Sequence, residues 1–283
     1  MATGIIKMVK ANYLIACLVL LLTFNIVRSQ NIVDQFPVFK VGEKITYSAV
    51  YNWGFIWINA GIVEFKVSNT NYKGKEVYHF NSYGYSVPSY DWLFKVRDYF
   101  QSYAQKNNLA PLFFDRNTYE GGFTVHNQFT FDYKDSLIYS KTENSDRPYK
   151  EDTLKLQQNI YDVISGVYYI RNLDFDKYKI NDTIPIRMII DNEIFDLYVR
   201  YLGKEVLKTH DKRKFNTIKF SALLIEGTIF SGGEDLYVWV SDDLNRIPIL
   251  VEAKILIGSV KATLTDTENL KFPFTSEIKV ESD

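Results

Sequence analysis

The sequence predicts an all-β protein: a strongly curved antiparallel sheet that closes toward a barrel, with one short helix packed against it. Aromatic residues make up 16% of the 283 residues, and aromatic and β-branched side chains fit the half-buried surface of a sheet. Short segments alternate between apolar and polar residues, which is typical of strands with one buried face. The chain has no alternation of strands with helices and no repeat of fixed period, which argues against parallel α/β folds and solenoids.

The beginning of the chain has the pattern of an export signal. Lys7 and Lys10 form a short basic start, and residues 13–27 form an apolar run. This run is shorter than the roughly 20 residues that a membrane-spanning helix needs. We therefore expect a signal peptide over residues 1–29, followed by a single β-barrel-like domain over residues 30–283. An uncleaved anchor is the alternative.

Cys17 is the only cysteine of the chain. Residues 14–17 resemble the box at which bacterial lipoproteins are cut and lipidated, but the apolar segment before Cys17 is too short for a signal core. We expect no acyl chain on Cys17 and no disulfide in the mature protein, so the core alone must hold the fold. The formal net charge is -1, which gives no broad positive field to hold nucleic acid or an anionic membrane.

Strands follow one another at short spacing along the rest of the chain. Each candidate alternates in hydropathy and is bounded by turn residues such as Gly, Asn and Asp. The expected strands are residues 45–51, 60–67, 76–85, 97–105, 112–119, 122–133, 136–141, 183–190, 193–203, 215–226, 236–240, 249–255 and 260–264.

Two segments interrupt this series. Residues 89–96 predict one helical turn capped by Ser89, with Trp92 and Leu93 turned inward. Residues 142–152 are polar and contain Pro148, which favours a surface loop between the two halves of the chain.

One convincing helix is predicted, over residues 161–173. Asp162 lies near its start, where a carboxylate is favoured. One face recurs at three- and four-residue spacing and contains Ile160, Ile164, Val167, Tyr168 and Arg171. A single helix suffices to cap a sheet, so we place it at one mouth of the barrel or inside its curve.

Residues 236–264 predict three consecutive antiparallel strands. Asp242 and Asp243 lie at the first turn, where adjacent carboxylates point apart and are well solvated, so we interpret this turn as structural rather than catalytic. Arg246 is expected to pair with Asp242 or Asp243, and anion binding is the alternative for this side chain.

The residue pattern does not indicate catalysis, and we expect no enzyme, cofactor or metal site. His79, His126 and His210 have no His or Cys neighbour at the spacing of metal ligands. The chain has no GxSxG nucleophile motif. Its glycine pairs lack the strand-to-helix context and the lysine of a phosphate-binding loop.

Four large apolar residues lie between the first two expected strands. Trp53, Phe55, Ile56 and Trp57 are too apolar for an ordinary solvated turn. They form either a plug on the open mouth of the sheet or a lip that meets an apolar ligand or another envelope protein. Together with Trp92, they are the candidate contacts of an apolar ligand or partner.

Three blocks of sequence resemble domain-of-unknown-function family 3108. They are GEKITY at 42–47 with NAG at 59–61, DVISGVYYIR at 162–171, and VWVSDD at 238–243 with the RIP and GSV that follow it. This family consists of exported proteins of Gram-negative envelopes. The resemblance implies a strongly curved antiparallel sheet closing toward a barrel, broadly similar to the lipoprotein-carrier folds. It implies no reaction and no catalytic residues.

The sequence leaves three functions open, which we rank. The first is a non-enzymatic binding or carrier module for an apolar small molecule or lipid, located in the periplasm or outer envelope without a membrane span after cleavage. The second is a structural or protein-interaction component of the envelope. An enzyme of unrecognised type ranks third. The first two differ in whether the concave side of the sheet is open or filled by side chains.

Overall fold

The structure, a computed structural model, describes residues 37–53, 56–225, 233–254 and 259–279, and the side chains of residues 51–60 are not described. The expected signal peptide at 1–29, Cys17 and Phe55 lie outside the described residues, and so do the side chains of Trp53, Ile56 and Trp57. The expectations for these residues stay predictions. Within the described ranges, no helix is long and apolar enough to cross a membrane.

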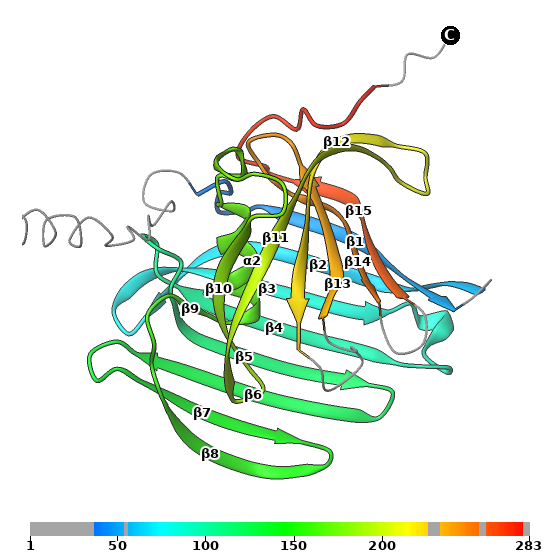
Figure 1. Ribbon diagram of the computed structural model, residues 1–283. Coiled ribbons are helices and arrows are strands. Elements are labelled where there is room, and N and C mark those ends of the chain that lie inside the picture. The colour runs from blue at the N-terminus through cyan, green and yellow to red at the C-terminus, as the bar shows by residue number, and fades with distance from the viewer. Residues whose placement is uncertain (1–36, 54–55, 226–232, 255–258, 280–283) are drawn as a thin grey trace, which may run out of the picture. The chain divides into compact units, whose positions relative to one another are not determined.

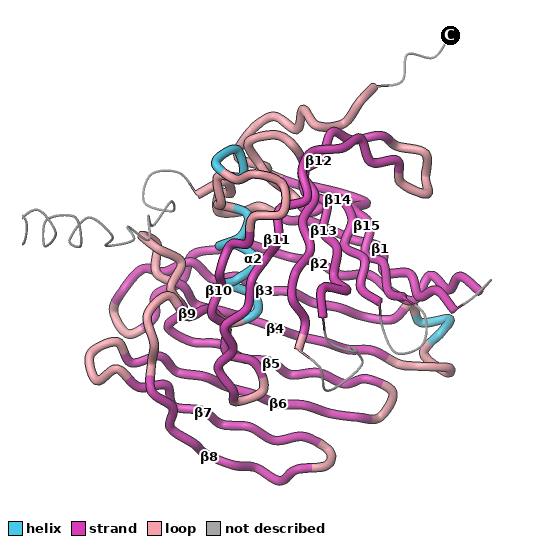
Figure 2. Tube along the Cα trace, viewed as in Figure 1, coloured by secondary structure: helices cyan, strands magenta, loops and turns pink. Residues whose placement is uncertain are grey.

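The described part consists of a 15-stranded sheet, one α-helix and two 3-10 helices (Figures 1 and 2). The helices are η2 (Pro88–Tyr90), α2 (Val163–Arg171) and η3 (Phe175–Lys177). The strands are β1 (Lys44–Trp53), β2 (Ile56–Tyr72), β3 (Lys75–Ser86), β4 (Val96–Ala104), β5 (Pro111–Glu120), β6 (Phe123–Asp132), β7 (Leu137–Asn144), β8 (Arg147–Lys155), β9 (Ile160–Tyr161), β10 (Thr183–Ile190), β11 (Glu193–Lys208), β12 (Lys214–Leu224), β13 (Gly233–Ser241), β14 (Pro248–Lys254) and β15 (Ser259–Glu268).

The strand order is two meanders joined at the first and last strands. Strands β1 to β8 pair with their sequence neighbours outward to one edge, and β15 to β9 do the same toward the other edge. The meanders meet where β1 pairs antiparallel with β15. All the described pairs are antiparallel except β9 with β10. Strands β8 and β9 are consecutive in sequence, yet they are the two edges of the sheet.

Helix α2 lies inside the curl of the sheet (Figure 1). It contacts β3 and β4 in one half of the strand order and β9 and β10 at the far end of the other half. Strands this far apart can share one short helix only if the sheet curls round it. The predicted curved antiparallel sheet with one helix packed against it is therefore confirmed. We call the face toward α2 the inner face.

A capping box fixes the start of α2. The Asp162 Oδ1 accepts hydrogen bonds from the backbone N–H groups of Ile164 and Ser165, and the Ser165 Oγ accepts one from the Asp162 N–H. The other carboxylate oxygen accepts a 2.6 Å bond from the Ser102 hydroxyl on β4, which ties the helix to the sheet. The helix is shorter than the predicted 161–173 because Tyr161 pairs with Met188 in the sheet.

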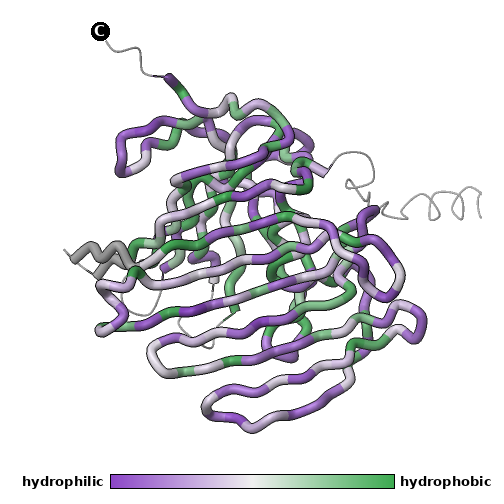
Figure 3. Tube along the Cα trace, turned by 180° about the vertical axis from the view of Figure 1, so that it is seen from behind, coloured by the Kyte–Doolittle hydropathy of each residue, from purple (hydrophilic) through white to green (hydrophobic). Residues whose placement is uncertain are grey.

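The core is built from inward-facing apolar residues of the strands around α2. Figure 3 shows hydrophobic and hydrophilic residues mixed along each strand, as alternation requires. The Phe80 ring stacks on the Tyr168 ring of α2 at a centroid distance of 3.9 Å. Phe39, which precedes β1, meets both rings edge-on. These three aromatic side chains join the sheet, the helix and the start of the domain.

A buried ion pair connects the three sequence blocks that carry the family resemblance. Glu43 and Arg171 have side chains that are 1% and 3% exposed. The Arg171 Nη1 and Nη2 donate to the Glu43 carboxylate at 2.7 and 3.1 Å, and Nη2 also donates to the Asn245 carbonyl. Glu43 comes from the first block, Arg171 from the second and Asn245 from the turn of the third. The three blocks therefore meet at one buried ion pair.

The prediction of a loop over residues 142–152 is wrong. Residues 142–152 do not form a loop: they form the end of β7 and most of β8, with the Asn144 side chain accepting the N–H groups of Asp146 and Arg147 at the turn. Strand β8 is an edge strand and mostly exposed, so it lacks apolar alternation, and an edge tolerates Pro148.

Arg246 does not pair with Asp242 or Asp243. It lies 4.0 Å from Asp174, which follows α2. Asp243 instead accepts the Asn245 N–H and the backbone N–H groups of Thr275 and Ser276. The Asp243 carboxylate thus holds the C-terminal segment against the turn after β13.

Candidate functional site

Short side chains form a row across the middle of the inner face. Ala49 of β1 lies opposite Gly61 of β2 and Ala262 of β15, and Ala262 lies opposite Val251 of β14. We call Gly61, Ala49, Ala262 and Val251 the inner row. Gly61 is required here because a Cβ atom would lie 2.4 Å from the Tyr85 carbonyl oxygen.

The inner row is partly exposed although it faces the inside of the curl. Ala49, Ala262 and Val251 are half-buried, whereas Tyr47 and Leu264, two residues further along the same strands, are fully buried. Helix α2 has only nine residues, about 14 Å of helix, and is too short to cover the full length of the strands. Among the described residues, the inner face is therefore filled near α2 and only partly buried along the inner row.

Two buried polar atoms without hydrogen-bond partners lie further along the inner face, on β4 and β5. Asp98 of β4 lies between Gly84 of β3 and Thr118 of β5. Its Oδ1 is buried and has no hydrogen-bond partner among the described atoms, and the same holds for the Nε of Arg116 on β5. Unmade hydrogen bonds on buried groups are costly, so these two atoms are available to a bound polar group.

The pKa of Asp98 is raised to about 7. Burial is the main cause and the negative charge of Glu120 adds to it, while the Arg116 charge and the Tyr119 backbone N–H act in the opposite direction. A carboxyl group that titrates near neutrality is unusual for a structural residue and marks this part of the inner face as a candidate site.

The turn between β10 and β11 reaches across the curl and binds the opposite half of the sheet. Asp191 accepts 2.9 Å bonds from the Arg116 Nη1 on β5 and the Asn127 Nδ2 on β6. Asn192 donates its Nδ2 to Asp152 on β8 at 3.2 Å. We call these contacts the clasp. Hydrogen bonds between side chains, rather than backbone pairing of β8 with β9, hold the two edges of the curled sheet together.

The loop before β4 carries the most exposed apolar side chains of this region. Trp92, Leu93 and Phe94 are 81%, 56% and 54% exposed, so the expectation that Trp92 and Leu93 turn inward is wrong. Helix η2 begins after Val87 without a side-chain cap, so Ser89 is not the cap either. We call residues 90–94 the aromatic loop. Of the five candidate contact residues, Trp92 alone has a described side chain.

The histidines lie outside this site. On the outer face, hydrogen bonds link His79 to Gln101, Gln101 to Asp115, and Asp115 to His126 across β3 to β6. His210 is exposed in the turn after β11. Among the residues that the structure describes, no group of three or more His, Cys, Asp and Glu is placed to hold a metal ion.

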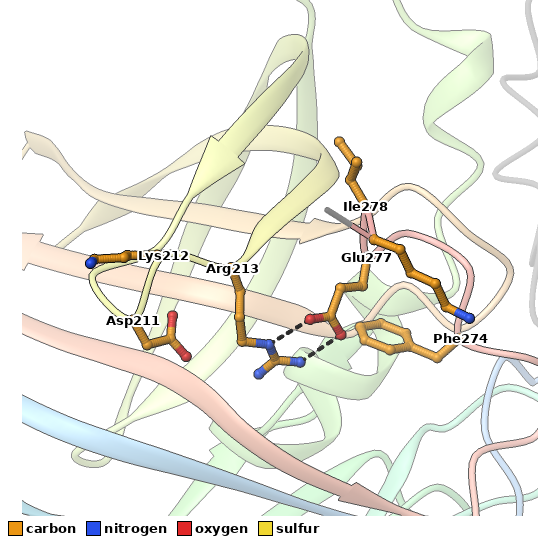
Figure 4. Close-up of a pocket in the computed structure, with 7 residues that line it drawn as sticks. Asp211, Lys212, Arg213, Phe274, Glu277 and Ile278 are labelled. Atoms are coloured by element: carbon orange, nitrogen blue, oxygen red, sulfur yellow. Dashed lines mark hydrogen bonds and ion pairs between the residues drawn. The ribbon is translucent and has the colours of Figure 1, made fainter. Parts of the chain in front are cut away.

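A surface hollow of about 460 Å³ lies between the turn after β11 and the C-terminal segment (Figure 4). Within it, the Nε and Nη2 of Arg213 donate to the two carboxylate oxygens of Glu277 at 2.7 and 2.8 Å. Because these two charged groups satisfy each other, the hollow is better explained as the joint that fixes the C-terminal segment to β12.

Sequence reasoning missed Asp98, Arg116 and the inner row. The alternation in β4 identifies two faces, but one contains Asp98 and Phe100 and the other Arg97 and Tyr99, so both are mixed. One signal in the sequence could have indicated the site. By alternation, the charged Asp98 shares a face of β4 with the small residues Ser102 and Ala104, and both of these are buried in the structure.

The Asp98 carboxyl predicts a specific pH dependence of stability. The folded-state pKa of about 7 lies above the unfolded value of about 3.9. Its contribution is therefore fully present below pH 4 and is lost as the pH rises through 7. Between pH 4 and 7 the unmodified protein should lose stability that Asp98→Asn does not lose, as measured by urea unfolding. Parallel pH profiles for the two proteins would contradict the assignment.

The fold is that of a β-barrel-like protein. A similar solved structure is the crystal structure of a beta-barrel-like protein of domain of unknown function DUF1849 from Brucella abortus, with a TM-score of 0.52 and 10% sequence identity over 82% of this chain and 99% of that chain. At this identity the likeness concerns the fold alone. No curated protein matches the chain.

The sequence pattern of DUF3108, a protein family of unknown function, matches residues 46–265. This chain belongs to that family, as its three sequence blocks predicted. The matched region includes the inner row, the aromatic loop, the clasp and helix α2.

Proposed function

We propose that this protein is a non-enzymatic binding or carrier module for an apolar small molecule or lipid, which lies along the inner row. The partly exposed row of short apolar side chains on the inner face carries this proposal. Ligand sites in proteins are typically concave and mostly apolar, with a few polar groups that fix orientation. Asp98 and Arg116 offer polar atoms further along the same face.

The ligand class follows from the two kinds of surface. Ala49, Ala262 and Val251 offer apolar contact, whereas the Asp98 Oδ1 and the Arg116 Nε offer one acceptor and one donor. A ligand with an apolar body and a small polar end satisfies both. The export signal expected at residues 1–29 supports a location in the periplasm or outer envelope.

Filling the inner row should abolish ligand uptake. Val251 and Leu250 are neighbours on β14, and alternation places Val251 on the inner face and Leu250 on the outer face. Val251→Trp should reduce the uptake of an apolar fluorescent probe at least tenfold, because the indole occupies the space of the ligand, whereas Leu250→Trp should leave uptake unchanged. Probe titration at matched protein concentrations measures both.

Thermal melting of the two variants provides the control. Both introduce an indole, and Val251→Trp adds only one methylene more volume than Leu250→Trp. If the melting temperature falls by a similar amount in both variants, a loss of uptake in Val251→Trp alone reflects blocking rather than overpacking. If Val251→Trp binds the probe as well as Leu250→Trp does, the inner row is not the ligand site.

A structural or protein-interaction role in the envelope is the second candidate function. The exposed aromatic loop favours it, since contiguous exposed apolar groups mark interaction sites. If the unmodified protein takes up no apolar probe while the aromatic loop is needed for association with another envelope protein, this second function replaces the first.

A further inference from the structure

We propose that Ser68, on the outer face of the sheet, is a nucleophile that accepts an acyl group from an ester, with His79 as its base. The site is separate from the inner row, whose proposed binding role involves no reaction. It is built from the neighbouring strands β2, β3, β4 and β5, which lie side by side (Figure 1). Because each strand supplies one residue, no motif of adjacent residues marks the site in the sequence.

Ser68 on β2 and His79 on β3 lie directly opposite each other. The Ser68 Oγ is 3.3 Å from the His79 Nδ1 and 3.4 Å from the carbonyl oxygen of the same residue, so the ring nitrogen is the closer acceptor. Both residues are half-buried, which leaves the hydroxyl within reach of a small substrate. A serine hydroxyl hydrogen-bonded to a histidine ring is the arrangement that activates serine as a nucleophile.

The hydrogen bonds on the other side of the ring fix where its proton lies. The Gln101 Nε2 donates to the Asp115 Oδ2 at 3.1 Å, because a carboxylate can only accept. The Gln101 Oε1 therefore faces the His79 Nε2 and accepts its hydrogen at 3.1 Å. This leaves the Nδ1 lone pair for the Ser68 hydroxyl. The His126 Nε2 donates to the other Asp115 oxygen at 3.1 Å and holds this carboxylate in place.

The protonation state of His79 suits a base. Burial lowers the pKa of the His79 ring from its ordinary value, while the hydrogen bond with Gln101 acts in the opposite direction. At pH 7 the ring is therefore mostly neutral and can accept a proton. Hydroxyl, imidazole and amide thus have the order of nucleophile, base and orienting group that acyl transfer requires.

A free edge of β2 lies next to Ser68. On the β1 side, β2 is paired with a described strand only as far as Lys66, and the Val67 N–H and C=O bond to the segment before β1. Backbone groups of alternate residues point to the same side of a strand, so the Asn69 N–H points to this free side. The residue after a nucleophilic serine supplies a donor of this kind in hydrolases, and such a donor stabilises the negative oxygen of the acyl intermediate.

Aromatic rings beside His79 indicate the class of acyl group. The Tyr103 ring meets the His79 ring edge-on at a centroid distance of 5.0 Å. It also lies 5.2 Å from the Tyr72 ring and 5.4 Å from the Phe113 ring. All three aromatic side chains are half-buried. An apolar or aromatic acyl chain can pack against them, so we assign the site to esters of apolar acids.

The reaction is an acyl transfer in two steps. The Ser68 Oγ bonds to the carbonyl carbon of the ester as the His79 Nδ1 takes the hydroxyl proton, and the Asn69 N–H donates to the negative oxygen. The bond to the alcohol oxygen then breaks, and the alcohol leaves with the proton from His79. Water attacks the acyl group on Ser68 in the same way, which releases the acid and restores the hydroxyl. Ester and water thus become acid and alcohol.

Reaction of the full protein with p-nitrophenyl butyrate tests the proposal. The unmodified protein should release p-nitrophenol in an initial burst of about one equivalent per chain, with the butyryl group on Ser68 by peptide mass spectrometry. Ser68→Ala should abolish the burst. His79→Gln keeps the serine but removes the base, and should slow acylation at least hundredfold. The matched controls Ser145→Ala and His210→Gln change exposed residues outside this network and should react like the unmodified protein.

Gln101 is a positioning residue, and a pH profile of acylation tests its role. Gln101→Glu places a negative charge against the His79 ring and raises its pKa. Acylation should therefore reach half of its maximum at a higher pH than in the unmodified protein. If the amide only supports the fold, this midpoint stays where it is.

Three results would overturn the proposal: no burst from the unmodified protein, a butyryl group on lysines or other serines but not on Ser68, or equal acylation rates for the unmodified protein and His79→Gln. Mapping the acyl group on the unmodified protein needs no variant to fold. Uptake of the apolar probe should be unchanged in Ser68→Ala, which keeps this test independent of the inner row.

Discussion

Replacing Glu43 with Met should lower the free energy of unfolding by about 3–5 kcal/mol. The substitution leaves the Arg171 guanidinium inside the protein with a carbonyl of Asn245 but without a counter-charge. A buried ion pair adds little net stability, yet removing one partner exposes the full cost of the other buried charge. Urea unfolding at pH 7 measures the change.

The double variant Glu43→Met with Arg171→Met tests whether the loss comes from the unpaired charge of Arg171. It removes both charges, so it should be clearly more stable than Glu43→Met alone, despite carrying one more substitution. Arg187→Gln provides a surface control, because its partner Asp196 is 74% exposed, and it should change stability by about 1 kcal/mol or less. If Glu43→Met behaves like this control, breaking the buried ion pair between Glu43 and Arg171 does not destabilise the fold.

Phe80→Ala should destabilise the protein by about 3–5 kcal/mol. The Phe80 side chain is 0% exposed and stacks on Tyr168, while Phe39 packs against both rings. Its removal leaves a cavity between the sheet and α2 that neither element can close, because Asp162 and Arg171 fix the helix at both ends. Thermal and urea unfolding measure the loss.

Tyr83→Ala on the same strand is the matched control for Phe80→Ala. Tyr83 is 39% exposed and contributes to the outer face, so its truncation should change stability by about 0.5 kcal/mol. Equal losses at the two positions would show that the aromatic stack contributes nothing beyond an ordinary strand position.

The period-two patterns predicted most strands because they report one buried face. Strand β10 has the bounds that the sequence predicted, 183–190, since it packs on the core along its length. Strand β8 was missed because an exposed edge strand needs no alternation. Trp92 was placed inward because a large aromatic residue is usually buried, and no pattern within its own segment reveals that the loop projects from the sheet.

The candidate site could be predicted only in part, since it depends on pairs that are distant in sequence. Arg171 matched the apolar face of the helix by its spacing, but its partner Glu43 is 128 positions away. Ala49 and Ala262 were each expected in a strand, and their adjacency follows from the β1–β15 pairing, which strand patterns do not specify. The side chains of Trp53, Ile56 and Trp57 lie outside the described residues, so plug and lip both stay open as interpretations.

The pairing of β1 with β15 determines when this protein can finish folding. Lys44 lies opposite Glu268 and Asn52 opposite Ser259, so the central ladder of the sheet joins the first and the last of the described strands. Each meander can form from local hairpins, but β1 keeps an open edge until the C-terminal strand arrives. Such long-range pairing slows folding and leaves an unpaired strand exposed in the interval. A chain shortened before β15 would keep that edge permanently and should be prone to pairing with other copies.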